Sequence, residues 1–387
     1  MTPAARIAAA ISLLDAVLAG ESAERALTNW GRANRFAGSS DRATVRDHVY
    51  DALRCRGSFA TLGGALSGRG LMLGLCRSEG IDPATIFTAE GHAPAALSAD
   101  EAQAPAVPSF DALCASDWPD WLLPQLLADL GDDFPAVSAA MRSRAPVFLR
   151  VNLAKTTLAK AQDVLAEDGI ETLPHLAAET ALEVTAGARR IAQARAYLQG
   201  LVEVQDAGSQ ALLCGLDLPQ KARVLDYCAG GGGKALALAA SHPGCRITAH
   251  DIDAARMKDI APRAARAGAR ITLAAPGKVD GKFDLVMVDA PCSGSGTWRR
   301  TPEAKWRLTP AHLDERVALQ GDILRRAAAH VAPGGKLLYM TCSLLRAENA
   351  GQIAAFLDRG GFALETTKDL TPRAGTDGFF GALLRRL

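Results

Sequence analysis

The chain has 387 residues, 49% of them hydrophobic and 22% charged, and carries a formal net charge of +1. This length leaves room for two or three domains that each bury a core, and the composition is ordinary for a globular protein. No stretch approaches the about 20 unbroken apolar residues of a membrane-spanning helix, which excludes an integral membrane protein of that type. The balanced charge also excludes chain-wide attraction to nucleic acid, so such a site would have to be a local basic patch.

The N-terminal run Ala4 to Leu18 is rich in alanine and is interrupted by Arg6 and Asp15. It predicts an amphipathic helix and lacks the cleavage pattern of a signal peptide. We therefore expect a cytoplasmic protein with no membrane partner, whose eight cysteines stay reduced. No two cysteines form a CxxC pair, and the seven histidines are scattered without ligand spacing, so we expect no metal site.

Residues 1–75 are predicted to form a helical region. Val45, Val49 and Leu53 recur at helical spacing, and Asp41 is placed to cap the helix that they stabilise. Further along, a set of glycines is expected to break the helical pattern: Gly57, Gly63, Gly64, Gly68 and Gly70.

Residues 76–143 are predicted to be a linker region with short helices. The Ala- and Pro-rich stretch from Ala89 to Pro108 has little from which to build a core, and we expect an irregular connection there. Short helices are expected around Trp118 to Leu130 and around Phe134 to Arg142.

Residues 144–205 are predicted to form a small α/β module. The sequence VFLRVN, which begins at Val147, is typical of a strand, and Leu201 to Val204 is typical of another. Leu158 to Glu167 lies between them and has the pattern of a helix.

Residues 206–387 alternate apolar strands with helices, which is typical of a parallel sheet covered by helices on both faces. We expect seven strands. They are placed near Arg223 to Asp226, Arg246 to His250, Ile271 to Leu273, Phe283 to Val288, Lys336 to Thr341, Phe362 to Glu365, and Phe379 to Leu384.

A glycine-rich loop follows the first of these strands. Tyr227 to Gly233 connects the strand to a helix that opens near Lys234, so backbone can approach a ligand closely there. The loop does not match GxGxxG, and Ala235 after the lysine disfavours a nucleoside triphosphatase. One strand later, Asp251 stands where a carboxylate accepts hydrogen bonds from a ribose diol. These features indicate a nucleoside-containing cofactor, and the alternative is a tight turn with a helix-capping aspartate.

Two cysteines stand at strand ends. The sequence Asp289-Ala290-Pro291-Cys292 and the sequence Thr341-Cys342-Ser343 both fall at the carboxyl edge of the predicted sheet, where open α/β folds bind ligands. We expect the two thiols to face one cleft. Five other cysteines are interpreted as small buried hydrophobic residues: Cys55, Cys76, Cys114, Cys214 and Cys245.

Together these motifs resemble the RsmB/Sun/NOP2 family of RNA cytosine-5 methyltransferases, in its bacterial RsmB-like branch. The family loop CAAPGGK is similar to CAGGGGK at Cys228 to Lys234, and the family block DAPCSGxG is Asp289 to Gly296. The TCS block at Thr341 is followed by Glu348 and Asn349, and the ending DGFF begins at Asp377.

The resemblance implies an α/β class I methyltransferase, with a Rossmann-like seven-stranded sheet over 206–387. It also implies an RRM-like module over 144–205, because FLRVN and VEVQDAGSQ resemble the module that precedes the family's catalytic domain. The helical region 1–75 resembles the family's NusB-like extension in shorter form.

The resemblance also implies the reaction: methyl transfer from S-adenosyl-L-methionine to carbon 5 of a cytosine in RNA. Cys342 would attack carbon 6 and form a covalent intermediate, Asp289 would act at ring nitrogen 3 with a raised pKa, and Cys292 would help release the product. Implied cofactor contacts are Cys228, Ala229, Gly230, Gly231, Gly232, Gly233, Lys234, Asp251 and Asp289. The implied partner is RNA, as 16S rRNA or an assembling ribosomal subunit.

The sequence departs from the family pattern in two places. The Gly-Asp pair expected after the third strand, which holds the adenine amino group, is replaced by LAAPGKVDGKFD, and Asp280 lies too close to the next strand to replace it. Gly230 and Gly231 stand where the family has Ala-Pro, which adds backbone freedom to the loop.

Several alternatives remain open at this point. The RNA could be a transfer RNA, the chain could be a catalytically weak RNA-binding ribosome-assembly factor, or the substrate could be DNA, although DNA enzymes place the nucleophile at the Pro-Cys position. For RNA contact, basic residues interleave with Trp298 and Trp306, and the competing interpretation is a solvated loop with two buried indoles. These basic residues are Arg299, Arg300, Lys305 and Arg307.

Overall fold

The computed structural model describes residues 1–103 and 105–387 and divides the chain into two compact units. The first, which we call the helical unit, contains Met1–Arg144 and Trp298–Leu308; the second, the sheet unit, contains Ala145–Thr297 and Thr309–Leu387. The chain therefore enters or leaves the helical unit at three points. The segment Trp298–Leu308, which follows the loop that contains Cys292, belongs to the helical unit.

The helical unit confirms the predicted N-terminal helical region. Its buried core includes Val45, Val49 and Leu53, and Asp41 accepts a hydrogen bond from the Gly38 N–H at the start of their helix. Residues 76–143 add further helices, and residue 104 of the expected irregular connection lies outside the described residues. The helices are α1 (Pro3–Leu18), α2 (Ala23–Ala33), α3 (Ser39–Arg54), α4 (Arg56–Gly63), α5 (Gly68–Ser78), α6 (Ala99–Ala102), α7 (Phe110–Ser116), α8 (Leu123–Leu130), α9 (Phe134–Met141) and α15 (Pro302–Arg307). The likeness to NusB and the boundaries at 75, 143 and 205 stay predictions.

The expected break in the helical pattern lies between Gly63, the last residue of α4, and Gly68, the first residue of α5, with Gly64 capping α4. Gly57 and Gly70 lie within these helices and do not break them. The glycines of the two helices also allow α4 and α5 to pack with backbones in contact. A Cβ atom on Gly63 would lie 1.8 Å from the carbonyl oxygen of Gly70, and one on Gly74 would lie 2.0 Å from that of Phe59. The absence of a side chain is thus a packing requirement here, and it outweighs the low helix propensity of glycine.

The segment Trp298–Leu308 is built into the core of the helical unit. Trp298 is 1% exposed, and the indole of Trp306 donates a hydrogen bond to the Leu53 carbonyl at 2.7 Å. The Lys305 Nζ donates to the Arg54 carbonyl at 2.9 Å, and burial lowers the pKa of Lys305 to about 8. Arg299 is also buried. The burial of Trp298, Arg299 and Lys305 favours the competing interpretation of buried indoles for this segment, whereas Arg300 and Arg307 are exposed.

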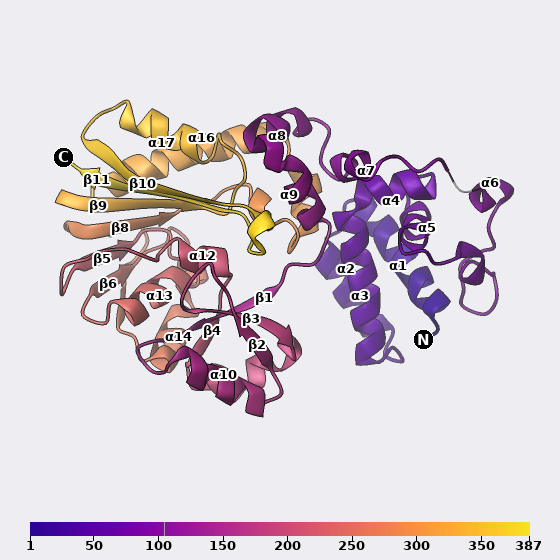
Figure 1. Cartoon of the computed structure of the whole chain (residues 1–387), viewed down its shortest axis with the longest axis horizontal. Coiled ribbons are helices and arrows are strands. Elements are labelled where there is room, and N and C mark those ends of the chain that lie inside the picture. Colours follow the sequence, from indigo (N-terminus) through magenta and orange to yellow (C-terminus); the bar gives the residue numbers. More distant parts are fainter. Residues whose placement is uncertain (104) are drawn as a thin grey trace. The chain divides into compact units, whose positions relative to one another are not determined.

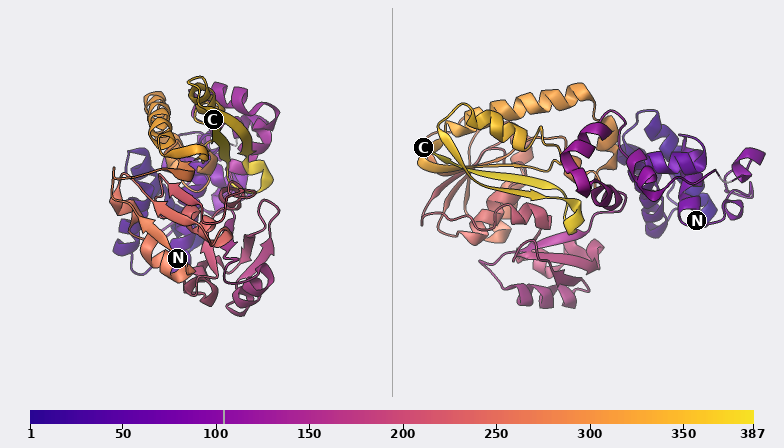
Figure 2. Two further views of the ribbon diagram at one scale, coloured as in Figure 1. Left: turned by 90° about the vertical axis from the view of Figure 1, so that its left-hand side faces the viewer. Right: turned by 45° about the horizontal axis from the view of Figure 1, so that its top comes forward.

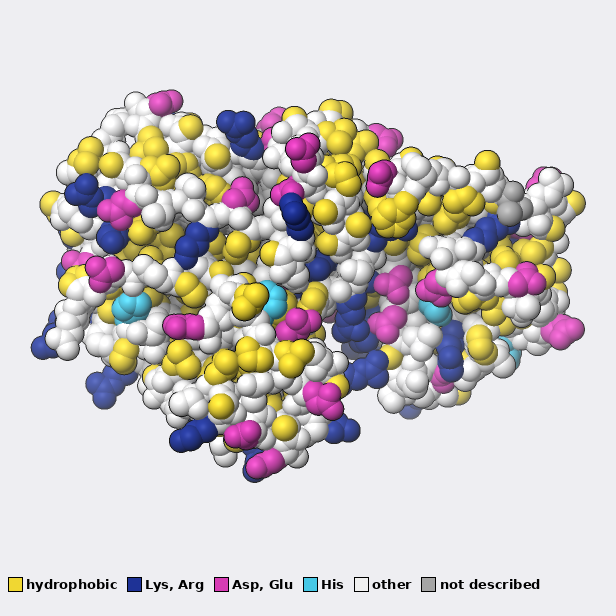
Figure 3. Space-filling view, viewed as in Figure 1, with side chains coloured by type: hydrophobic (Ala, Val, Ile, Leu, Met, Phe, Trp, Pro, Cys, Tyr) yellow, Lys and Arg dark blue, Asp and Glu magenta, His cyan; other side chains and the backbone are white. Residues whose placement is uncertain are grey.

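No large basic patch dominates the face of the molecule shown in Figure 3. Lys and Arg side chains are interspersed there with acidic and hydrophobic ones, in keeping with a net charge of +1. Among the described residues no single helix is long and apolar enough to cross a membrane, and only the bent pair α4 and α5, at 89° to each other, reaches that length and composition together.

The sheet unit begins with the small α/β module. Its four strands form an antiparallel sheet in the order β2-β3-β1-β4. The predicted strands and helix are present as β1 (Val147–Val151), α10 (Leu158–Glu167) and β4 (Val202–Val204). The sequence interpretation missed β2 (Glu171–Pro174) and β3 (Ala181–Ala186), of which β2 is short and largely exposed. The order matches a ferredoxin-like fold.

The large sheet contains all seven predicted strands, in the order β10-β11-β9-β8-β5-β6-β7. Helices cover it on two sides: α16 and α17 lie on one face and α13 and α14 on the other (Figure 1). The strands are β5 (Arg223–Asp226), β6 (Arg246–Ala249), β7 (Ile271–Leu273), β8 (Phe283–Asp289), β9 (Val331–Thr341), β10 (Phe362–Leu370) and β11 (Phe379–Arg386). The helices are α12 (Ala207–Ala211), α13 (Gly233–Ser241), α14 (Ile260–Ala267), α16 (Pro310–Ala328) and α17 (Ala350–Leu357).

The prediction of a parallel sheet needs one correction, because β11 runs antiparallel to both of its neighbours, β9 and β10. The connection between β10 and β11, residues 371–378, is shorter than the dozen or so residues that a parallel crossover requires. The two strands therefore form a hairpin, seen as the long yellow strands in Figure 2.

The close packing of α4 and α5 predicts opposite effects for two glycines of the helical unit. Gly74→Ala should lower the free energy of unfolding by about 2–3 kcal/mol, because its methyl group meets the Phe59 backbone. Gly31→Ala in α2, where the nearest atom lies at 3.9 Å, should raise it by up to about 1 kcal/mol. All five tryptophans of the chain lie in this unit, so urea unfolding followed by tryptophan fluorescence reports it directly. Equal effects of the two substitutions would contradict the packing argument.

Candidate active site

The predicted site residues of strands β5, β8 and β9 meet at the carboxyl edge of the large sheet. β5 lies between β6 and β8, so connections leave it in both directions and a crevice forms at the ends of β5 and β8. Asp226 ends β5 and Asp289 ends β8. β8 and β9 are parallel, with Asp289 opposite Met340, which brings Cys292 and Cys342 to the same edge.

The glycine loop has the shape that the sequence predicts. Gly230 and Gly232 have φ angles of +49° and +78°, a region that favours glycine. The Gly230 N–H donates to the Asp251 carboxylate at 3.0 Å, and Asp251 is 1% exposed. Asp251 therefore fixes the loop as well as standing at the end of β6. Burial raises the pKa of Cys228 to about 12, so its thiol stays protonated. Its backbone, and not its thiol, is the part that can approach a ligand.

Lys234, the first lysine of α13, joins the loop to the β8 end. Its Nζ lies 2.7 Å from the Asp289 carboxylate, whose side chain is 41% exposed. Burial alone would lower the pKa of Lys234, but the contact with Asp289 outweighs it, and the pKa lies above its ordinary value. The contact holds the Asp289 side chain beside the cysteines.

The two strand-end cysteines are paired. Their Sγ atoms are 3.5 Å apart, and both residues are partly buried. The hydrogen bond from Cys292 lowers the pKa of Cys342 against the opposing effects of burial and of Asp289. The same contact, with burial and the charge of Glu348, raises the pKa of Cys292. The arrangement therefore favours a thiolate on Cys342 and a thiol on Cys292.

Glu348 ties the two cysteine loops together. It is fully buried, and its carboxylate accepts hydrogen bonds from the N–H of Ser293, at 2.7 Å, and from the hydroxyls of Ser293 and Ser343. The Gln320 amide donates to it at 2.9 Å. Because Ser293 follows Cys292 and Ser343 follows Cys342, one carboxylate sets the separation of both cysteines.

Asp226 was missed as a site residue in the sequence interpretation. It is 1% exposed, and neither of its carboxylate oxygens has a hydrogen-bond partner among the described residues. Burial raises the pKa of Asp226 to about 7, and the nearby Asp289 adds to the shift. The signal was present: an acidic residue closes an apolar strand directly before the glycine loop.

The altered segment after β7 is held by a histidine. The Gly277 N–H donates to His250 Nε2 at 3.1 Å, while His250 Nδ1 lies 2.8 Å from the Tyr227 carbonyl oxygen. The shortened turn is thus tied to the end of β6 by backbone and imidazole in place of a carboxylate.

The remaining cysteines fit their interpretation as packing residues. Cys55, Cys76 and Cys114 are buried, and Cys214 and Cys245 are partly buried. Within residues 1–103 and 105–387, no group of three or more His, Cys, Asp or Glu side chains is arranged to hold a metal ion.

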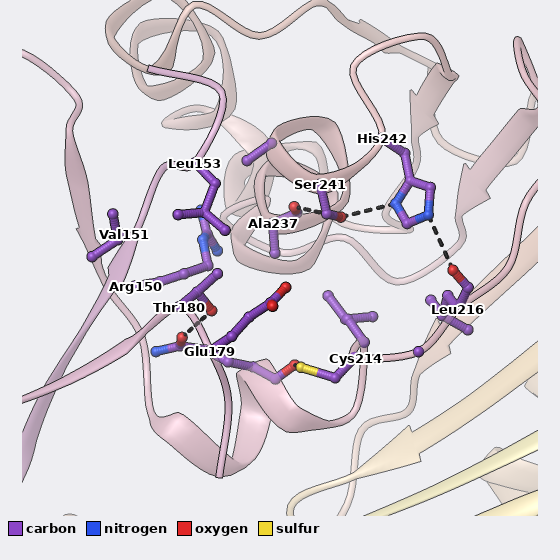
Figure 4. A pocket seen from close by; sticks show the side chains of 14 residues that line it. Arg150, Val151, Leu153, Glu179, Thr180, Cys214, Leu216, Ala237, Ser241 and His242 are labelled. Carbon is purple, nitrogen blue, oxygen red and sulfur yellow. Dashed lines mark hydrogen bonds between the residues drawn. The ribbon is translucent and has the colours of Figure 1, made fainter. Parts of the chain in front are cut away.

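A cavity of about 250 Å³ lies between the small module and α13 (Figure 4). The fourteen residues that line it include none of the predicted catalytic or cofactor residues. Several of its polar groups already have partners: His242 bonds Ser241 and the Leu216 carbonyl, and Thr180 bonds Gln210. We therefore do not assign the cavity a ligand.

Two family models match the chain. The one described as 16S rRNA methyltransferase RsmB/F matches residues 213–385, and the ferredoxin-like domain of RsmF/B-like methyltransferases matches residues 118–189. Similar curated proteins are named ribosomal RNA small subunit methyltransferase B. The one from Xanthomonas campestris is 40% identical over 62% of this chain and 57% of its own length. The one from Pectobacterium carotovorum is 33% identical over 69% and 66%. The chain thus spans less than two thirds of these relatives.

Solved structures share the fold. The crystal structure of a protein named PH0851 covers 100% of this chain and 99% of its own, with a TM-score of 0.76 and 24% identity. A methyltransferase homolog from Pyrococcus horikoshii covers 70% and 96%, with a TM-score of 0.61 and 24% identity. The Rossmann-like methyltransferase fold and the ferredoxin-like module are therefore established. Because the RsmB/F model matches residues 213–385, where the predicted motifs converge on one sheet edge, and the ferredoxin-like model matches residues 118–189, the chain belongs to the RsmB/F family of methyltransferases.

Proposed function

We propose that this protein transfers a methyl group from S-adenosylmethionine to carbon 5 of a cytosine in RNA, with 16S rRNA as the substrate. The observation that carries the proposal is the thiol pair, in which Cys292 and Cys342 lie 3.5 Å apart with opposite pKa shifts. A binding module has no chemical need for a polarised pair of thiols beside a carboxylate.

The residues present fit the cofactor. S-adenosylmethionine supplies an electrophilic methyl group when bound, and it carries an ammonium group and a ribose diol. The Asp226 carboxylate, which lacks a partner, suits a cationic group, and Asp251 at the end of β6 suits a diol. The glycine loop from Cys228 to Lys234 offers close backbone approach between them.

Cys342 acts as the nucleophile in this proposal. Cytosine carbon 5 is a poor nucleophile until a thiolate adds at carbon 6, which moves the ring electrons toward carbon 5. A lowered pKa increases the thiolate fraction of Cys342, and Lys234 contributes to that lowering. In the release step solvent water takes the proton from carbon 5, the C–H electron pair re-forms the double bond between carbons 5 and 6, and Cys342 Sγ leaves carbon 6 as a thiolate with the electron pair of the broken bond.

Asp289 orients the cytosine ring. Lys234 lies 2.7 Å from the Asp289 carboxyl group and fixes its position beside the cysteines. A protonated ring nitrogen or an exocyclic amino group would donate to it. The exposed part of the side chain leaves room for this contact.

Cys292 serves product release. It carries its proton at neutral pH, and its thiol lies in hydrogen-bond contact with Cys342 Sγ, 3.5 Å away. A partner that donates to the sulfur of Cys342 eases departure of that sulfur from carbon 6.

The choice of 16S rRNA rests on the names of the relatives and of the family model. A transfer RNA substrate would use the same chemistry. The ribosome-assembly alternative relied on the altered adenine segment, and His250 now gives that segment a defined anchor. A DNA cytosine enzyme would place its nucleophile at the Pro-Cys position, whereas the pKa shifts favour Cys342 over Cys292.

Cys342→Ala should abolish transfer of tritiated methyl groups to RNA from cells that lack the modification, because the reaction loses its nucleophile. Digestion of the wild-type product should yield 5-methylcytosine in 16S rRNA. Cys245→Ala, which removes a partly buried thiol of the same unit, should retain activity. Near-normal turnover by a folded Cys342→Ala protein would refute the proposed mechanism.

Cys292→Ala should move the pH midpoint for alkylation of Cys342 by iodoacetamide to a higher pH. The substitution removes the hydrogen bond that contributes most to the lowered pKa of Cys342, so less thiolate exists at a given pH. Mass spectrometry of the labelled peptide across a pH series measures the midpoint. A midpoint that stays in place or falls would mean that the two thiols are not coupled.

Asp251→Ala should weaken S-adenosylmethionine binding by about tenfold or more, because it removes a charged hydrogen-bond acceptor and releases the Gly230 N–H. Isothermal titration calorimetry gives the dissociation constant. Asp253→Ala, two residues away and exposed, is the matched control and should bind normally. Equal binding by both variants would exclude Asp251 from the cofactor site.

A further inference from the structure

The glycine loop of this chain lacks the Ala-Pro pair that would stiffen it. Gly230 and Gly231 stand in its place, and Gly230 has a φ of +49°. Two adjacent glycines lose more conformational entropy on ordering than an Ala-Pro pair does. A loop with this sequence therefore needs contacts from outside itself to hold one conformation.

Arg263 of α14 supplies such a contact. Its Nη1 donates a hydrogen bond to the Gly231 carbonyl oxygen. A Cβ atom on Gly231 would lie only 3.1 Å from that same nitrogen, so the guanidinium packs directly against the loop where a side chain would stand. Charge-assisted hydrogen bonds are the stronger kind, and this one fixes the peptide plane in the middle of the loop.

The position of Arg263 is set by the small module. Glu203 on β4 is 3% exposed, and its Oε2 accepts from Arg263 Nη2 at 3.0 Å. Its other oxygen accepts from Arg266, one helical turn further along α14. A buried carboxylate held by two guanidinium groups is a rigid anchor, because removing either partner leaves a charge incompletely compensated.

A second arginine, which belongs to the small module itself, holds the other end of the loop. Arg150 on β1 donates through Nη1 to the Gly233 carbonyl oxygen at 2.8 Å and also to Gln205. Burial lowers the pKa of Arg150 to about 10, which leaves it charged at neutral pH. The contact to the Gly233 carbonyl is therefore made by a residue of the small module, and the contact to the Gly231 carbonyl is made by a residue that the small module holds in place.

We propose that Arg263, held by Glu203 of the ferredoxin-like module, is a positioning residue that sets the glycine loop in its cofactor-binding conformation. The proposal rests on the proposed function, since it takes S-adenosylmethionine as the ligand of the loop. The small module is then part of the cofactor site. A loop that spends only a fraction of its time in the competent conformation binds with an affinity reduced by that fraction.

Arg266 provides a matched control for the test. It pairs with the same carboxylate, lies on the same helix and stacks on Tyr197 at 4.1 Å, but among the described residues it donates no hydrogen bond to the glycine loop. Arg266→Ala therefore also weakens the attachment of α14 to the small module. Only Arg263→Ala also frees the Gly231 carbonyl.

The experiment measures S-adenosylmethionine binding by calorimetry and, in the cofactor-free protein, amide hydrogen exchange of the peptide that spans 228–234. For Arg263→Ala we expect a dissociation constant raised at least about tenfold and faster exchange of the loop. For Arg266→Ala we expect both quantities to stay within about twofold of wild type. Arg263→Lys, which keeps the charge beside Glu203, should fall between wild type and Arg263→Ala and serves if the alanine variant does not fold.

Equal effects of Arg263→Ala and Arg266→Ala, or an unchanged loop in Arg263→Ala, would overturn the positioning role. Failure of the wild-type protein to bind S-adenosylmethionine would instead overturn the proposed function. The hydrogen-exchange comparison would then still decide whether Arg263 orders the loop, because it needs no cofactor.

Discussion

Parallel pairing of β8 with β9 is the constraint on which the candidate site depends. The register sets Asp289 opposite Met340, and each strand ends within three residues of a cysteine. The two thiols therefore meet at 3.5 Å, although fifty residues separate them in the sequence. A shift of register by one residue would turn every side chain of a strand to the opposite face and separate the pair.

Buried carboxylates hold the loops that this pairing brings together. Glu348 receives hydrogen bonds from the serines that follow both cysteines, Asp251 receives the Gly230 N–H, and Glu203 anchors the arginine that contacts Gly231. Hydrogen bonds to charged groups contribute more than neutral ones, and removing a partner leaves a costly buried charge. Buried, hydrogen-bonded carboxylates thus fix the two thiols relative to each other and the glycine loop relative to the sheet.

Much of this fold could be predicted from the sequence, because apolar periodicity is a local property. The seven strands of the large sheet and helix α10 were all found in this way. The features that could not be predicted from the sequence depend on contacts between distant segments. Nothing near Gly74 in sequence indicates that its neighbour is the Phe59 backbone, and nothing near Lys305 indicates that it is buried against Arg54. The antiparallel direction of β11 follows from a short connection that the strand pattern alone did not weigh.

The candidate site likewise contains some residues that the sequence predicts and others that only the folded structure reveals. Cys292, Cys342, Asp289 and Asp251 were chosen from their places at strand ends, and those places bring them to one edge. Asp226 was not chosen, since a strand-terminal aspartate becomes notable only when its oxygens are found buried without partners. Likewise, Arg263 and Glu203 lie sixty residues apart, so their joint contact with the loop requires the fold.

The most direct test of the account is a covalent trap. Purified Cys292→Ala protein is mixed with S-adenosylmethionine and RNA from cells that lack the modification, and a denaturing gel is searched for a protein–RNA band, with Cys292→Ala/Cys342→Ala as control. The account predicts a band that the double variant loses, because Cys342 forms the bond and Cys292 is needed to release it. A band that persists in the double variant, or efficient methylation by Cys292→Ala without any band, would contradict it.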